Sequence, residues 1–190
     1  MTTRFGFTFG LGCALLLAGC GGGRDGFYRL SATDLPAAVR GSSGVSVSVG
    51  PVSLPSYIDR TELVFQSGPN EFQLPTNARW IGSLQENISR VVASDLGALL
   101  RSNRVRSALD KGAPAPYRVA LDIRKFHGIS GNEAVLDLSW RIERGGGTIV
   151  RRSQNFRERI IGDGYEPMVA AESRLLGQAA QAIAASFRGR

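Results

Sequence analysis

The chain has 190 residues, of which 43% are hydrophobic, and this is enough for one globular domain with its own core. It carries 23 Lys and Arg against 16 Asp and Glu, a net charge of +7. Such a surplus suits nucleic acid, anionic lipid head groups or an acidic partner. Because no K/R-rich run, zinc-finger spacing or aromatic RNA-binding signature occurs, nucleic acid is excluded as an expected partner.

Residues 1–19 are predicted to be a lipoprotein signal peptide. Arg4 provides a short positive region, and residues 5–17 are apolar apart from small residues. This stretch falls short of the roughly 20 residues that a spanning helix needs. The LAGC at 17–20 resembles the bacterial lipobox, which implies cleavage before Cys20, a diacylglycerol thioether on its sulfur and an N-acyl lipid on its amine. Beyond this covalent lipid, no cofactor is expected.

Residues 20–26 are interpreted as the lipidated cysteine with a flexible glycine-rich tether, and residues 27–190 as the domain that follows. Cys13, the other cysteine, leaves with the signal peptide, so the mature domain has neither a disulfide nor a free thiol. Gly21 stands where the familiar inner-membrane retention signal has an aspartate. The expected location is therefore the outer membrane of a Gram-negative bacterium, with the domain facing the periplasm.

Extended segments are predicted in the first part of the domain. Residues 27–30 are typical of a short strand, and strict apolar/polar alternation over 45–49 indicates a half-buried one. Residues 62–66 resume extended structure. The turn at 68–70 then leads into 71–74, which we expect to be the hairpin partner.

The clearest amphipathic helix is predicted to begin at Ser83. Ser83 and Glu86 form a capping box, in which each side chain satisfies a free backbone N–H of the first turn. Pro114 and Pro116 forbid continuation, so the helix should end between 101 and 109. Its apolar face comprises Leu84, Ile88, Val91, Val92, Leu96, Leu99 and Leu100.

A three-strand meander and a second helix are predicted to complete the domain. Residues 117–126 and 134–142 alternate, the glycines at 145–147 supply a turn, and 148–160 return antiparallel. A final helix is predicted from about 166 to 187. This order of elements indicates an α+β domain with one antiparallel β-sheet and two amphipathic helices packed on one face.

Residues suited to catalysis are scarce, and we expect no enzyme activity. His127 is the only histidine and is expected to be a half-exposed strand residue. The sequence has no nucleophile elbow, no second histidine for a zinc triad and no mature cysteine for thiolate ligation. No catalytic residue and no metal ligand is therefore predicted.

The segment GPVSLPSYIDRTELVF at 50–65 has two prolines, Tyr57 and an Asp-Arg pair between two apolar runs. Asp59 and Arg60 are neighbours in an extended segment and should point in alternate directions, so they do not converge on one substrate. We expect a kinked connection whose prolines prevent sheet pairing. In this connection Asp59 would cap backbone donors, while Arg60 would pair or point to solvent.

The same segment carries the most specific resemblance to a known family. VGPVSLPSYIDR followed by ELV at 49–64 closely resembles the V-x-PV-x-LP-x-YLDR-x-x-(L/I)V signature of the PqiC-type (YmbA-like) ABC-type transport auxiliary lipoproteins, with Ile58 in place of the usual leucine. The positions that we expect to form a structural or partner-docking motif are Pro55, Tyr57, Asp59, Arg60 and Trp80.

The resemblance implies a non-enzymatic, outer-membrane docking subunit of an intermembrane lipid transport system that maintains envelope integrity. The implied partners are an MCE-domain protein with its inner-membrane components, outer-membrane lipid, and further copies of the chain in a ring-like homo-oligomer. An alternative is a lipoprotein activator of a cell-envelope (peptidoglycan) synthase, which a long Pro/Ala-rich tether would favour. The tether here is only a few glycines.

Arginines gather around one predicted hairpin of the meander. They are interpreted either as solvated strand faces or as a surface for anionic head groups or an acidic rim. These residues are Arg141, Arg144, Arg151, Arg152, Arg157 and Arg159.

Overall fold

The computed structural model describes residues 25–33, 44–130 and 132–187. Cys20, the signal peptide and most of the tether lie outside these residues, so the lipidation site stays a prediction. The elements in chain order are β1 (Gly26–Tyr28), β2 (Val47–Ser53), β3 (Phe65–Gly68), β4 (Glu71–Gln73), β5 (Ala78–Trp80), α1 (Leu84–Leu100), β6 (Val105–Ser107), β7 (Tyr117–Ile129), β8 (Glu133–Arg144), β9 (Gly147–Arg159) and α2 (Tyr165–Ala185).

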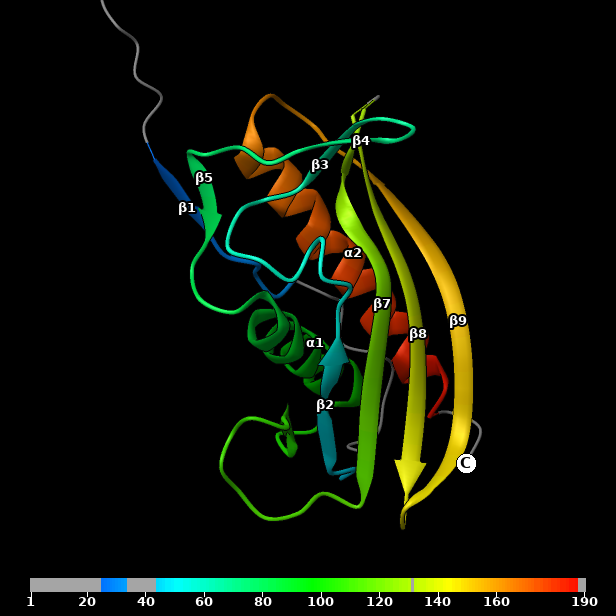
Figure 1. Cartoon of the computed structure of the whole chain (residues 1–190). Coiled ribbons are helices and arrows are strands. Elements are labelled where there is room, and N and C mark those ends of the chain that lie inside the picture. Colours follow the sequence, from blue (N-terminus) through cyan, green and yellow to red (C-terminus); the bar gives the residue numbers. More distant parts are fainter. Residues whose placement is uncertain (1–24, 34–43, 131, 188–190) are drawn as a thin grey trace, which may run out of the picture.

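Strand β7 is the centre of the main sheet. One of its sides pairs with β8, which pairs in turn with β9, and both pairings are antiparallel as predicted for the meander. The other side of β7 is shared by two strands: β2 pairs along its first half and β3 along its last residues. In Figure 1 the long strands β7, β8 and β9 lie side by side, with α2 packed behind them.

The prediction of an antiparallel sheet is wrong in one respect, because the sheet is mixed. β2 and β3 both run parallel to β7, and β6 runs parallel to β2. Parallel neighbours need a crossover connection, and α1 lies in the one that brings β6 beside β2. A second small sheet pairs β1 with β5, also in parallel. Neither β5 nor β6 was predicted from the sequence, and β6 lies within the window in which the helix was expected to end.

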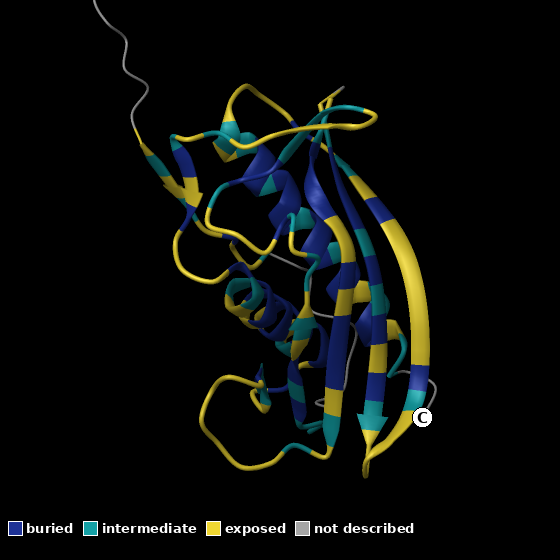
Figure 2. Ribbon diagram, viewed as in Figure 1, coloured by how far each residue is buried: buried dark blue, intermediate teal, exposed yellow. Residues whose placement is uncertain are grey.

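Both helices pack against each other and against the same face of the sheet, which confirms the α+β class. α1 contacts β2 and β6, while α2 contacts β8 and β9. All seven residues of the predicted apolar face of α1 are buried. Figure 2 shows the buried positions concentrated where the helices meet the strands. None of the helices in the described ranges is long and apolar enough to cross a membrane.

The ends of α1 follow from local chemistry. The Ser83 hydroxyl accepts a hydrogen bond from the Glu86 amide at 3.4 Å, which confirms the serine half of the predicted cap. At the other end Arg101 adopts the left-handed conformation, with φ 51°. The Ser102 amide then donates back to the Gly97 carbonyl at 3.0 Å, so the helix ends at the first position of the predicted window.

Candidate functional site: the motif corner at 50–65

The predicted motif forms a tight corner after β2. The amides of Ile58 and Asp59 both donate to the Pro55 carbonyl, at 3.0 and 3.1 Å. The Ile58 side chain is 1% exposed and enters the core. Its neighbours Asp59 and Arg60 are left on the surface. The corner is therefore held from inside by the one motif residue that departs from the family signature.

From the sequence, the prolines were expected to keep this segment out of the sheet. This expectation is wrong for the start of the segment. Pro51 lies within β2. Pairing with β6 ends at Val49, and the pairing with β7 shifts register between Val49 and Val52. The missing N–H of Pro51 thus falls at an interruption of the ladder, where its absence breaks no regular bond. Gly50 beside it has φ 133°, a conformation that side-chain-bearing residues rarely adopt.

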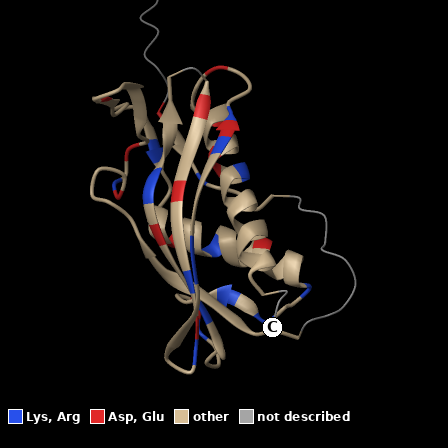
Figure 3. Cartoon of the chain, turned by 90° about the vertical axis from the view of Figure 1, so that its right-hand side faces the viewer, with Lys and Arg blue, Asp and Glu red and all other residues tan. Residues whose placement is uncertain are grey.

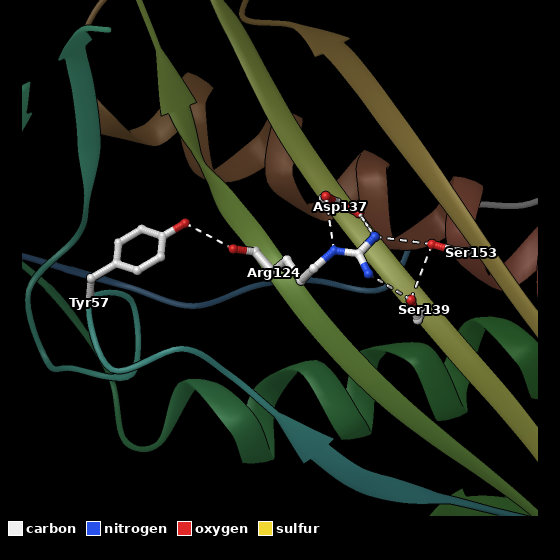
Figure 4. Close-up of polar contacts among 5 residues, drawn as sticks. All are labelled: Tyr57, Arg124, Asp137, Ser139 and Ser153. Atoms are coloured by element: carbon white, nitrogen blue, oxygen red, sulfur yellow. Dashed lines mark hydrogen bonds and ion pairs between the residues drawn. The ribbon is translucent and has the colours of Figure 1, made fainter. Parts of the chain in front are cut away.

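Tyr57 joins the corner to the long strands. Its hydroxyl donates to the Arg124 carbonyl of β7 at 3.0 Å, as Figure 4 shows. Its ring packs against Phe72, with centroids 5.3 Å apart, and edge-on against His127 at 5.8 Å. Burial raises the pKa of the Tyr57 phenol, and the nearby Asp137 carboxylate raises it further. Tyr57 therefore stays neutral and acts as a hydrogen-bond donor.

His127 is not half-exposed, as expected from the sequence, but 1% exposed. A register shift in β7 between Ile123 and Lys125 moves the later residues to opposite faces, so His127 lies on the side away from the helices. Phe72 packs edge-on against it, at 5.4 Å between centroids, and Tyr57 also covers it.

Both ring nitrogens of His127 have neighbours. Nε2 lies 3.3 Å from the side-chain oxygen of Gln66, and Nδ1 lies 3.5 Å from the Tyr57 hydroxyl. Burial lowers the pKa of His127 to about 4, and the positive charge of Lys125 adds to the effect. The imidazole is neutral at physiological pH and serves as a packed polar group of the corner.

Arg124 carries the corner's contact onward to β8 and β9. Its Nε donates to Asp137 Oδ2 at 3.1 Å, and its Nη2 donates to the other oxygen of the same carboxylate. The guanidinium also donates to the hydroxyls of Ser139 and Ser153, at 3.1 and 3.0 Å. Figure 4 shows this arrangement, which we call the Arg124 network. It ties three strands and the motif's tyrosine into one polar cluster.

The remaining motif residues have separate partners. Asp59 was predicted to cap backbone donors. It instead accepts a hydrogen bond from the Gln85 side-chain amide at 2.8 Å. Arg60 pairs with Glu62 at 3.1 Å, in line with one of its two expected roles. Trp80 is 7% exposed, and its amide donates to the Thr61 carbonyl at 2.7 Å. The motif thus splits into a buried framework and two exposed side chains.

Sequence reasoning missed the residues that complete this site: Gln66, Phe72, Arg124, Asp137, Ser139 and Ser153. Alternation does place 137 and 139 on the polar side of their strand. The missing information is the pairing of the strands, in which Ser139 lies opposite Asp122 and Asp137 opposite Lys125, on either side of the unpaired Arg124. Within the described ranges, no group of three or more His, Cys, Asp or Glu side chains is arranged to hold a metal ion.

The fold and the corner together define a small α+β domain that presents a surface corner packed against its central strand, β7. Solved structures share this fold. An uncharacterized protein aligns with a TM-score of 0.72 and 18% identity, over 86% of this chain and 99% of that chain. Protein XCC0632 from Xanthomonas campestris aligns with a TM-score of 0.70 and 15% identity, over 83% of this chain and 91% of that chain. At these identities the likeness shows the fold alone.

A PelC dodecamer from Paraburkholderia phytofirmans aligns at a TM-score of 0.45 and 14% identity, over 77% of this chain and 90% of that chain, a likeness too slight for any argument. No curated protein sequence matches the chain. The model of the ABC-type transport auxiliary lipoprotein component matches residues 28–184. The chain belongs to this lipoprotein family, which confirms the resemblance of the 49–64 segment.

Proposed function

We propose that this protein is the outer-membrane docking subunit of an MCE-type, ABC-linked system that moves lipid between the two membranes. The observation that carries the proposal is the family match, which spans residues 28–184 and names a transport auxiliary lipoprotein. The protein performs no chemistry of its own in this role. Energy comes from the inner-membrane components, and this chain positions the conduit at the outer membrane.

The anchor in this proposal is Cys20, with its diacylglycerol and N-acyl chains in the outer membrane and the domain facing the periplasm. Two or three chains give stable anchoring where a single one gives only reversible binding. Intact-mass measurement of the membrane-extracted protein tests this part. A polypeptide that begins at Cys20 without added acyl mass would rule it out.

The motif corner supports a docking role because it separates rigidity from exposure. Pro55, Ile58 and Tyr57 fix the backbone through the core and the Arg124 carbonyl. Asp59 and Arg60 are exposed on that fixed backbone, each held by one neighbouring side chain. Preorganised surface groups lose little conformational freedom on binding, so such a corner suits recognition of a partner. Further copies in a ring are part of the same proposal.

The decisive experiment is co-purification of the full-length protein with the MCE-domain partner. Asp59→Asn combined with Arg60→Gln should reduce recovery of the complex by about tenfold, the effect of roughly 1.4 kcal/mol of lost contacts. Arg90→Gln is a matched control, because Arg90 is likewise exposed and paired, with Glu86 at 3.5 Å. A folded double variant that recovers as much partner as this control would refute docking through the corner.

A further inference from the structure

A hollow lies on the sheet face turned away from the helices, near the β8–β9 hairpin. Its volume is about 580 Å³, and residues of β2, β7, β8 and β9 line it. The charged residues of its lining are Arg141, Arg151 and Arg152 together with a single acid, Asp122. Arg152 is opposite Trp140 on β8, so its side chain leaves the strand on the helix side, and Arg141 and Arg151 supply the cationic side chains of the hollow. We call this the arginine hollow. Figure 3 shows the basic and acidic residues of this part of the molecule.

Two arginines of this hollow are close enough to repel each other. Arg141 and Arg151 are directly opposite each other on β8 and β9. Side chains in such a pair leave the backbone only about 5 Å apart, and like charges there are destabilising. Arg141 has one acidic neighbour, Glu143 at 3.5 Å. Among the described residues, neither Arg151 nor Arg152 has a carboxylate within ion-pair distance.

The rim of the hollow adds hydroxyl donors. Ser139 and Ser153 line it and belong also to the Arg124 network. The Ser153 oxygen accepts bonds from Arg124 and from the Ser139 hydroxyl, at 3.0 and 3.1 Å. Its own proton has no acceptor among the described residues. Arg141, Arg151 and Ser153 therefore line the same hollow, and of the two guanidinium groups only that of Arg141 has a carboxylate neighbour among the described residues.

We propose that the arginine hollow binds a phosphate group, carried on the head group of an anionic phospholipid. Guanidinium forks bind phosphate oxygens in pairs, and a bound anion relieves the repulsion between Arg141 and Arg151. The hollow is far larger than one phosphate ion and falls within the size range of small-molecule sites. Pro51 and Ala120 give it an apolar side against which the glycerol part of a head group can pack.

Calorimetric titration of the full-length protein in non-ionic detergent and low salt tests the proposal. The two probes are glycerophosphoglycerol, the soluble head group of phosphatidylglycerol, and inorganic phosphate. Arg141→Gln combined with Arg151→Gln should weaken glycerophosphoglycerol binding about tenfold or more, since charge-assisted hydrogen bonds are lost. Arg151→Lys, which keeps the charge but loses the fork, should give an intermediate affinity.

The matched control is Arg157→Gln combined with Arg159→Gln, which removes the same charge from the other end of β9 and should change the affinity less than about twofold. Tighter binding of glycerophosphoglycerol than of phosphate supports the head group, and equal binding supports a free phosphate in the same hollow. Absence of saturable binding by both probes overturns the proposal. Equal weakening in both double variants, each with an unchanged melting curve, also overturns it, since it indicates diffuse electrostatics.

This inference stands apart from the proposed docking role. Failure of the titration leaves the partner interaction at Asp59 and Arg60 untouched. Failure of the co-purification leaves the affinity of the hollow measurable. The two double variants can therefore be compared in both assays.

Discussion

The outer face of the sheet, turned away from the helices, has two halves in which the arginines have different neighbours. In the half next to the motif, Arg124 is held by Asp137, Ser139 and Ser153. Farther along the strands, Arg157 pairs with Glu133 at 2.8 Å. In the half next to the hairpin, Arg141 and Arg151 face each other instead. Paired arginines hold strands together, whereas opposed arginines weaken the sheet unless an anion lies between them. The contrast separates a structural use of charge from a use in binding.

Tyr57→Ala changes the half of the face next to the motif and should have the largest effect on stability. It removes the ring that packs on Phe72 and His127 and the hydrogen bond to Arg124. Truncation of a fully buried aromatic costs about 3–5 kcal/mol, so a half-buried one should cost about 2–3 kcal/mol of unfolding free energy, measured by urea denaturation. Tyr57→Phe, the control, should cost only about 1 kcal/mol. Equal losses in the two variants would mean that the ring contributes no packing.

The pH dependence of stability tests whether His127, in the half of the face next to the motif, is shielded from water. Its pKa is about 4 in the folded chain against an ordinary value of 6.5, so the unfolded chain binds the proton more readily. Stability should therefore fall as the pH decreases from 6.5 towards 4, by about 1–2 kcal/mol at pH 5. His127→Gln should lose this part of the acid sensitivity. Identical pH profiles for the variant and the parent protein would show that His127 is open to solvent.

The smallest effect, of opposite sign, should come from Arg151→Thr in the hairpin half. The change removes the like-charge pair with Arg141 and places a β-branched residue in a strand. The free energy of unfolding should rise by about 0.2–1 kcal/mol in low salt, and less at about 1 M salt, where screening is strong. A loss of stability in low salt would show that Arg151 has a structural partner and would remove the contrast between the halves.

The elements that sequence reasoning predicted well are those whose periodicity is long and regular. The apolar face and cap of α1 and the 145–147 turn between β8 and β9 are where the patterns placed them. The three-residue strands β5 and β6 are too short to show a period, and without β6 the parallel crossover could not be inferred. Parallel pairing depends on where the chain returns after a helix, which no local pattern records.

The candidate site was predicted in its motif residues but not in its surroundings. Tyr57 was named from the motif, but its partners Phe72, Arg124 and His127 come from strands whose register the sequence does not specify. A single extra residue in β7 between Ile123 and Lys125 decides which face each later side chain occupies. The expectation for His127 is wrong for a different reason, because Tyr57 and Phe72 cover its ring on the outer face of the sheet.

The position of β9 at the edge of the sheet affects how copies of the chain can associate. Within the described residues β9 pairs with no strand other than β8, so it is an edge strand of the sheet. Long free edges recruit foreign strands, and charged side chains oppose this by repulsion and by their hydration. The arginines of β9 are therefore expected to oppose edge-to-edge pairing between copies of the chain; they are Arg151, Arg152, Arg157 and Arg159. Copies in the proposed ring-like oligomer are expected to meet through other surfaces.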